Sequence, residues 1–305
     1  MAEHIDWRAL YPFESHHMRL GSLRLHYLDE GSGNPLLMVH GNPTWSFYWR
    51  NLAIEFRQHF RVLVPDHIGC GLSDKPQNYD YSLAQHISNL VELIETRDLK
   101  NITLLAHDWG GAIGLGAALQ CADRFAQIVL FNTGAFPPPS IPRRIRACRI
   151  PGLGQIAVRG FNAFARAALT MATTNPAQFT PAVRSGFLYP YNSWANRIAI
   201  QRFVQDIPNS PQHSTWQTLA NIEASLKSLS DRPTKFIWGM QDWCFTPACL
   251  ERLLIHFPHA EVCRIAEAGH FVVEDAHAQI VTELNQFFHQ SVKLPPPSPQ
   301  ATTNG

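Results

Sequence analysis

The segment 102–111, ITLLAHDWGG, has the sequence pattern of a nucleophile elbow. An apolar run ends in Asp108 and passes directly into a predicted helix, and the residues two positions away, Ala106 and Gly110, are small. A sharp strand-to-helix turn needs small neighbours at these positions and directs the central side chain, with the helix N-terminus, at one site. The pattern therefore predicts that Asp108 is a nucleophile. The alternative is an aspartate that only caps the helix.

A carboxylate nucleophile favours a particular class of reaction. Attack on an ester or amide would give an anhydride, whereas attack on a saturated carbon that carries a good leaving group gives a stable alkyl ester. Halide and the oxygen of a strained epoxide are suitable leaving groups. Water must then hydrolyse the alkyl ester, and this step requires a general base and an oxyanion hole of backbone amides.

A histidine and a second aspartate occur late in the chain, in the order expected of a triad. His270 lies in EAGHFVVED, after the last predicted strand, where this chain order places the catalytic histidine. Asp242 follows the apolar run at 235–239, and we expect it to orient His270. The alternatives are a structural histidine and an aspartate that only stabilises a turn.

Residues 40–45, HGNPTW, follow another apolar run and predict a loop beside the nucleophile. The backbone amides of Asn42 and Trp109 are our candidates for the oxyanion hole. Their side chains also offer an amide and an indole N–H, neutral donors that suit a halide ion in a dry pocket. The alternative for Trp109 is a plain core residue.

Short apolar runs separated by helical stretches predict the elements that position these residues. Several runs are continuous rather than alternating, which is typical of parallel strands covered on both faces. We expect an α/β, doubly wound, mostly parallel sheet, with an early antiparallel hairpin and helices over 82–97 and 110–126. The predicted strands lie near 23–30, 36–40, 61–66, 102–108, 128–132, 235–239 and 261–265.

The alternation of strands and helices stops between about 136 and 213, where the sequence is rich in Ala, Arg, Phe and Pro. We expect an inserted helical cap over 136–213 and a main domain made of 1–135 and 214–293. The proline-rich, polar segment 294–305 predicts a mobile tail. No internal repeat is present.

The composition limits the classes of partner. The chain has 305 residues, 45% of them hydrophobic, and Lys plus Arg (25) nearly balances Asp plus Glu (24). Because the positive and negative charges nearly cancel, we expect neither nucleic acid nor a membrane as a partner. The composition favours a small, weakly charged ligand. The sequence leaves the oligomeric state open.

The cysteines and the N-terminus favour a cytoplasmic location. The six cysteines have irregular spacings without a CxxC pair, and the first residues lack the apolar core of a signal peptide. Residues 66–74, DHIGCGLSD, lack the spacing of a dinucleotide site and predict a tight turn near the active site. We therefore expect no cofactor and no metal.

Five motifs together resemble those of haloalkane dehalogenases. They are HGNPTWSFYWR at 40–50, PDHIGCGLSDKP at 65–76, HDWGG at 107–111, GMQDW at 239–243 and AGHF at 268–271. The resemblance covers about three quarters of the chain and implies the α/β-hydrolase fold and cofactor-free hydrolysis of carbon–halogen bonds to an alcohol, halide and proton.

Carried over by motif, the resemblance makes Asp108 the nucleophile, His270 the base and Asp242 the acid of the triad. It makes Asn42 and Trp109 the halide-binding pair. An acid after the later strand, with Asn42 as the second halide ligand, resembles the third subfamily of these enzymes. The cap matches the family least. The candidates for an apolar cavity lining in the cap region are Phe136, Phe161, Phe164 and Phe203.

Two other functions remain as alternatives. An epoxide hydrolase would use the same nucleophile and base, but it needs acids in the cap, and Tyr189 and Tyr191 are the candidates. Asn42 argues against this alternative, because epoxide hydrolases usually carry an aromatic residue there. The second alternative is a noncatalytic ligand-binding protein, since a fold alone does not establish catalysis.

Overall fold

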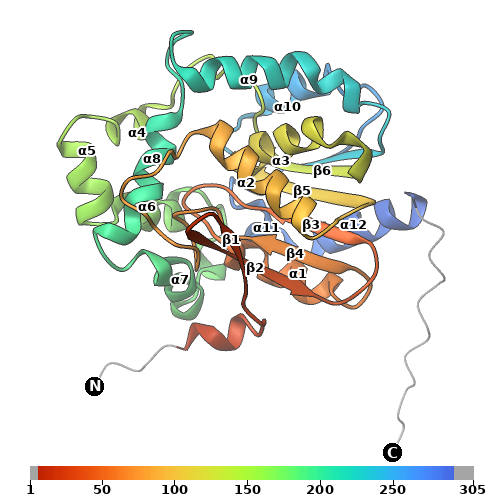
Figure 1. The fold of residues 1–305 in the computed structure, drawn as a ribbon, viewed down its shortest axis with the longest axis horizontal. Coiled ribbons are helices and arrows are strands. Elements are labelled where there is room, and N and C mark those ends of the chain that lie inside the picture. Colours follow the sequence, from red (N-terminus) through yellow and green to blue (C-terminus); the bar gives the residue numbers. More distant parts are fainter. Residues whose placement is uncertain (1–5, 292–305) are drawn as a thin grey trace, which may run out of the picture.

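Eight strands form a single sheet at the centre of the protein, seen in a computed structural model that describes residues 6–291 (Figure 1). Their spatial order is β1-β2-β4-β3-β5-β6-β7-β8. The bounds are β1 His16–Leu20, β2 Leu23–Glu30, β3 Pro35–Val39, β4 Arg61–Pro65, β5 Ile102–Asp108, β6 Phe125–Thr133, β7 Thr234–Gly239 and β8 Glu261–Ile265. Strand β2 pairs antiparallel with β1 and with β4, and all other pairs are parallel. The α/β prediction is confirmed. An early antiparallel hairpin is present, but it joins β2 to β1, a strand that the sequence analysis did not predict, and not to β3 across the turn that follows Glu30.

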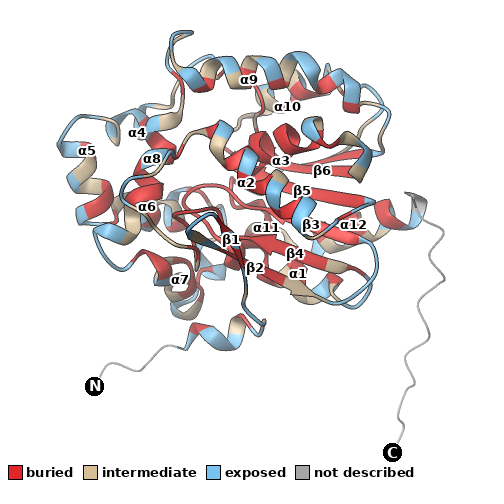
Figure 2. Cartoon of the chain, viewed as in Figure 1, coloured by how far each residue is buried: buried red, intermediate tan, exposed pale blue. Residues whose placement is uncertain are grey.

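Helices cover both faces of the sheet, which explains why the central strands are buried along their whole length and mostly apolar. Every residue of β3, β5 and β7 is buried (Figure 2). Neighbouring residues of β5 point to opposite faces, so Leu104 belongs to one hydrophobic core and Leu105 to the other. One face is covered by α2 Leu83–Thr96, α3 Trp109–Gln120, α9 Ser214–Ser225 and α10 Pro247–Leu254, and the other by α1 Arg50–Phe56, α11 Val272–Asp275 and α12 His277–Ser291.

Residues 136–213 fold into helices without a strand and form one end of the molecule, beyond the carboxyl ends of the parallel strands (Figure 1). We call this segment the cap. Its helices are α4 Arg143–Ala147, α5 Leu153–Gln155, α6 Ala163–Met171, α7 Pro181–Leu188 and α8 Ile198–Asp206. Short 3-10 turns lie at Trp7–Leu10, Ser46–Trp49, Ala122–Arg124, Pro176–Gln178, Tyr189–Tyr191, Ala195–Arg197 and Leu226–Leu229, and a π turn lies at Ile156–Gly160.

The predicted tail, 294–305, lies outside the described residues. Within 6–291, no helix combines the length and the apolar character needed to cross a bilayer.

A buried ion pair fixes the segment that follows the last strand to the body of the protein. Arg50 on α1 makes two hydrogen bonds to the carboxylate of Glu274 on α11, the longer of them 3.0 Å from Nη2 to Oε2. The two side chains are only 3% and 4% exposed. The guanidinium also lies 4.2 Å from the ring centroid of Phe47. Glu274 is four residues after His270, so this pair holds the loop that carries the predicted base.

We predict that Glu274→Gln lowers the free energy of unfolding by about 3 kcal/mol, because it leaves the Arg50 cation buried without its counter-charge. Urea denaturation followed by circular dichroism measures the change. The matched control is Glu251→Gln, which breaks the exposed pair of Glu251 with Arg264 and should cost less than about 1 kcal/mol. Equal losses in the two variants would contradict this role for the buried pair.

Candidate active site

The chain turns sharply at Asp108, the last residue of β5. Asp108 has a φ of +54°, and helix α3 begins at the next residue. A Cβ placed on Gly110 would lie 2.2 Å from the carbonyl oxygen of Val39, so only glycine lets α3 approach β3 this closely. Thr133 at the end of β6 donates a hydrogen bond from Oγ1 to the carbonyl oxygen of Asp108, at 2.5 Å. These contacts hold a strained nucleophile elbow in place.

Backbone amides surround one oxygen of the Asp108 carboxylate. The amide of Asn42 donates to Oδ1 at 2.6 Å, and the amide of Trp109 also donates to the carboxyl group. The loop that carries Asn42 reaches this position because Gly41 has no side chain, whose Cβ would lie 2.0 Å from Oδ1. Burial raises the pKa of Asp108, while His270 and the two amides oppose this rise.

His270 lies between the carboxylates of Asp108 and Asp242. Its Nδ1 is 2.8 Å from Oδ2 of Asp242, and its Nε2 is 3.7 Å from Oδ2 of Asp108. Burial alone lowers the pKa of His270, but the charges of Asp242 and Asp108 and the hydrogen bond with Asp242 outweigh burial, so the pKa lies above its usual 6.5. The structure thus brings together, in one line, the three side chains that the sequence singled out.

Two residues that the sequence analysis missed hold this line in position. Asn132 in β6 donates from Nδ2 to Oδ2 of Asp242 at 3.0 Å and accepts from the amide of Gly239 at 2.7 Å. His107 joins Nε2 to the carbonyl oxygen of His270 at 2.8 Å. The sequence did contain one indication of a role for Asn132, because it is a polar residue near the end of an otherwise apolar predicted strand. His107 offered only its position next to Asp108.

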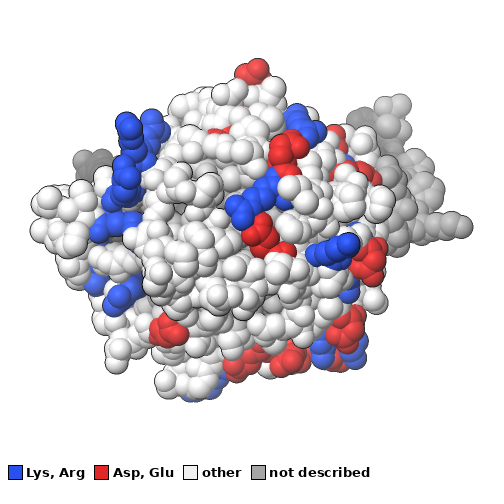
Figure 3. Space-filling view, turned by 90° about the horizontal axis from the view of Figure 1, so that it is seen from above, with Lys and Arg blue, Asp and Glu red and all other residues white. Residues whose placement is uncertain are grey.

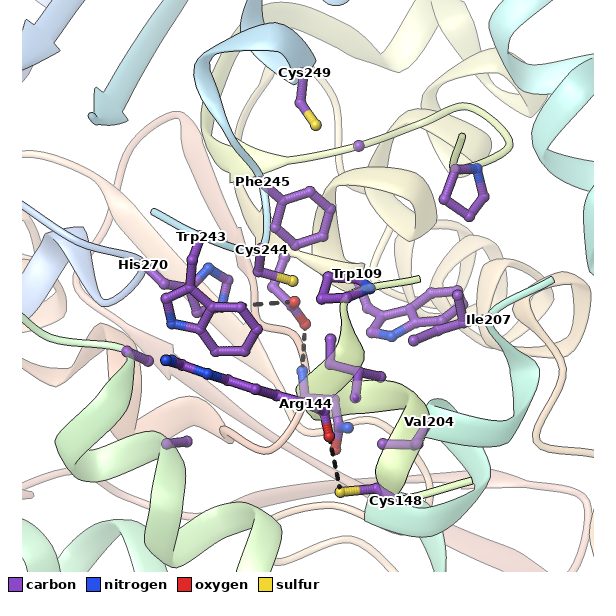
Figure 4. Close-up of a pocket in the computed structure, with 18 of the residues that line it drawn as sticks. Trp109, Arg144, Cys148, Val204, Ile207, Trp243, Cys244, Phe245, Cys249 and His270 are labelled. Carbon is purple, nitrogen blue, oxygen red and sulfur yellow. Dashed lines mark hydrogen bonds and ion pairs between the residues drawn. The ribbon is translucent and has the colours of Figure 1, made fainter. Parts of the chain in front are cut away.

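A cavity of about 440 Å³ lies above these residues, between the main domain and the cap. Its floor includes Asp108 and His270. Figure 4 shows His270 and Trp243 on one side of this pocket, and Val204 and Ile207 of the cap region on the other. The lining is mostly apolar, so a substrate that fills the cavity is transferred out of water. The few polar groups at the floor then act in a medium of low dielectric constant.

The side chains of Asn42 and Trp109 both line the cavity. Nε1 of Trp109 makes no hydrogen bond to any part of the chain that the structure describes, which leaves an indole donor free. Nδ2 of Asn42 is 3.3 Å from the carbonyl oxygen of Ile200 on α8, and Oδ1 of Asn42 is buried without a hydrogen-bond partner among the described residues. Phe203 of α8 contacts the Trp109 ring at 5.5 Å between centroids.

The proposed aromatic lining is only partly found. Phe136 and Phe164 line the cavity, whereas Phe203 lies behind Trp109 and is not in the lining. Phe161 is not in the lining and is 72% exposed. An aromatic residue in a helical cap can therefore face the cavity, the core or solvent, and the sequence alone did not separate these cases.

The tyrosines considered as epoxide-opening acids do not line the cavity. The hydroxyl of Tyr191 donates to the carbonyl oxygen of Thr44 at 2.9 Å, and that of Tyr189 accepts from Arg8 at the surface. The site therefore lacks the two phenolic donors that the epoxide hydrolase alternative required.

The segment 66–74 forms a tight turn close to the site. Leu72 donates its amide to the buried carboxylate of Asp66, and His67 Nε2 lies 2.8 Å from the carbonyl oxygen of His40, next to Gly41. The turn therefore supports the loop that carries Asn42. Among residues 6–291, no three His, Cys, Asp or Glu side chains are grouped as metal ligands would be.

Comparisons with known proteins agree with this geometry. A sequence model described as alpha/beta hydrolase fold matches residues 34–276. The chain is 42% identical to a cis-3-alkyl-4-alkyloxetan-2-one decarboxylase of Shewanella oneidensis, over 94% of this chain and 92% of that protein. It is 32% identical to haloalkane dehalogenase 2 of Mycobacterium tuberculosis, over 92% and 96%. Among solved structures, it is similar to the haloalkane dehalogenase DatA of Agrobacterium tumefaciens C58, with a TM-score of 0.84, 25% identity and coverage of 92% and 97%.

We predict that Asp242→Asn lowers the pKa of His270 by roughly one unit or more, because it removes the nearest counter-charge from the imidazolium. An NMR titration of the histidine side chains, with His270→Gln to assign the signal, measures the shift. Asp231→Asn, which changes an exposed aspartate outside the site, is the control and should leave that titration unchanged. An unaltered pKa in Asp242→Asn would show that Asp242 does not set the charge of His270.

Proposed function

Because the chain belongs to the alpha/beta hydrolase fold family and is a homologue of haloalkane dehalogenases, we propose that Asp108 displaces halide from a saturated carbon. The observation that supports this proposal most strongly is the placement of the two Asp108 carboxylate oxygens at the floor of an apolar cavity. Oδ1 is held by backbone amides, and Oδ2 faces His270 and the cavity. The products are an alcohol, a halide ion and a proton.

The first step forms an ester between Asp108 and the substrate. Oδ2 attacks the carbon opposite the leaving halogen, the carbon–halogen bond breaks, and the halide leaves with the bonding electrons. The indole N–H of Trp109 and the side-chain amide of Asn42 are our proposed halide ligands. Neutral donors in an apolar cavity stabilise the developing anion without holding the product as strongly as a cation would.

The second step is hydrolysis of the ester. Nε2 of His270 accepts a proton from water, and the hydroxide attacks the carboxyl carbon of Asp108. Oδ1 becomes the oxyanion, already bonded to the amide of Asn42 and next to that of Trp109. Asp242 stabilises the imidazolium. Collapse of the intermediate releases the alcohol and restores the Asp108 carboxylate.

Opening of an oxetan-2-one ring is a second candidate, and the 42% identical relative that carries this substrate in its name favours it. The first step would be the same, with ring carbon C4 attacked and the ring carboxylate displaced. The C2–C3 bond then breaks, its electrons form the C3=C4 double bond, and carbon dioxide and the Asp108 carboxylate leave. This reaction consumes no water, so it needs no base at the second step.

The free thiols of all six cysteines support a reducing, cytoplasmic location. The acid at Asp242 and the placement of Asn42 support the third subfamily of haloalkane dehalogenases as the nearest match among these enzymes.

We predict that the protein releases halide from a panel of bromoalkanes and chloroalkanes and that Asp108→Ala releases none, because the variant lacks the nucleophile. Ion chromatography measures the halide. A cis-3,4-dialkyl oxetan-2-one is tested in parallel, with alkene followed by gas chromatography. Alkene without halide would move the function to the second candidate, and neither product would overturn both.

We predict that His270→Ala releases one equivalent of bromide per chain and then stops, because the ester forms but is not hydrolysed. Mass spectrometry should show the chain heavier by the alkyl group, on the peptide that contains Asp108. With the oxetan-2-one, the same variant should continue to release alkene if the second candidate is correct. Repeated release of bromide by His270→Ala would exclude His270 as the base.

A further inference from the structure

The positive charge of the protein is concentrated in the cap. Residues 136–213 contain nine arginines and a single acidic residue, Asp206, which leaves 16 basic and 23 acidic residues elsewhere in the chain. The even overall charge therefore conceals a strongly positive cap and a negative remainder. The arginines are Arg143, Arg144, Arg146, Arg149, Arg159, Arg166, Arg184, Arg197 and Arg202.

None of these cap arginines forms an ion pair within the part of the chain that the structure describes, although the charge of Asp206 partly offsets the effect of burial on the pKa of Arg149. Every ion pair found among residues 6–291 lies outside the cap, and most of the main-domain arginines that are exposed or partly exposed take part in one. The cap arginines repel one another instead, since burial and the charge of Arg166 lower the pKa of Arg197. Figure 3 shows basic side chains in a stripe on the side of the molecule where the cap lies.

The cap also exposes large apolar side chains. Among the described residues, eight large hydrophobic side chains are exposed to solvent, and seven of them are in the cap. Leu153 is 69% and Phe161 is 72% exposed. The seven are Ile150, Leu153, Ile156, Phe161, Met171, Tyr189 and Trp194.

Five of these residues, Ile150, Leu153, Ile156, Phe161 and Trp194, we call the cap patch. Helix α5, which carries Leu153, stands at the outer end of the molecule (Figures 1 and 2). A Cβ placed on the exposed Gly160 would lie 3.7 Å from Ile156 and 3.8 Å from Trp194, so these two side chains adjoin the same surface position.

Arginine side chains border the cap patch. The guanidinium of Arg159 lies 4.8 Å from the ring centroid of Trp194, and Arg197 donates to the carbonyl oxygen of Gly160 at 2.9 Å. Arg143 and Arg146 on α4 precede the first patch residue in the chain, and Arg166 on α6 lies between Phe161 and Trp194; all three arginines are exposed. Apolar side chains and cations thus occupy the same end of the molecule.

We propose that the cap docks on the surface of an anionic phospholipid bilayer. Arginines bind lipid phosphates, while protruding leucine, isoleucine, phenylalanine and tryptophan side chains enter the interface between headgroups and acyl chains. A convex apolar tip enters a fluid lipid layer directly, whereas a protein partner would need a hollow of matching shape. Docking of this kind takes place at the bilayer surface and requires no membrane-spanning helix.

Docking in this orientation would place the cavity near the lipid. Arg144 and Met171 line the cavity and are also exposed, and Cys148, another lining residue, is two residues before Ile150. An apolar substrate dissolved in the bilayer could then reach Asp108 without crossing bulk water. This last step rests on the proposed function, but docking itself does not.

The test is co-sedimentation of the full chain with vesicles. We expect binding to vesicles that contain phosphatidylglycerol, little binding to pure phosphatidylcholine, and weakening at high salt. Arg143→Gln/Arg146→Gln should lower the partition coefficient about fivefold per arginine. The matched control, Arg19→Gln/Lys227→Gln, removes two exposed cations of the main domain that form no ion pair within residues 6–291 and should bind as the unaltered protein does.

The apolar contribution is tested separately with Leu153→Ser/Phe161→Ser, which should also reduce vesicle binding. Ile255→Ser is its control, because Ile255 is 76% exposed but lies outside the cap. Absence of binding to the anionic vesicles overturns the proposal, as does full binding by the Leu153→Ser/Phe161→Ser variant. A change of oligomeric state in that variant, seen by sedimentation velocity without vesicle binding, would identify a contact between copies instead. None of these outcomes depends on whether halide or alkene is released.

Discussion

A buried carboxylate, which the proposed reaction requires to be ionised, is the constraint around which the site is built. Asp108 loses hydration at the floor of an apolar cavity, and burial raises its pKa. The protein replaces the lost water with two backbone amides and the field of His270. Supplying those amides requires the positive φ at Asp108, the close approach of the loop at Gly41, and the start of α3 directly after the strand. The backbone geometry at the ends of β3 and β5 therefore serves to stabilise a single charge, that of the Asp108 carboxylate.

The same carboxylate is compatible with both of the reactions proposed for this protein. Once a carboxylate has displaced a leaving group from carbon, the fate of the ester depends on what reaches it next: water activated by histidine, or an elimination within the bound molecule. The floor of the cavity, with Asp108 and its amides, fits both of the routes that we propose. The difference then lies in the substrate that the apolar walls admit and in how water is held beside His270.

Much of this architecture followed from local sequence patterns. Short runs rich in apolar residues located β5 and β8 to the residue, and the small residues on either side of Asp108 were enough to indicate the elbow. Asn132 was missed because its role depends on contact with Asp242, more than a hundred residues away. The orientations of Phe161 and Phe203 depend on how cap helices pack, which periodicity does not encode. The net charge did not reveal the basic cap, because a sum over all residues does not record where in the chain the charges lie.

The connection between β6 and β7 has a consequence for folding during synthesis. β6 pairs with β5 on one side and β7 on the other, but the whole cap and α9 separate β6 from β7 in the chain. At about 5–20 residues per second, the ribosome takes several seconds to deliver β7 after β6 has emerged. Throughout that interval one edge of an apolar strand, which ends beside the future active site, has no partner. The hydrogen bonds of Asn132 to Gly239 and Asp242 can form only after this wait, so the proposed triad is completed late, by the last strands of the sheet.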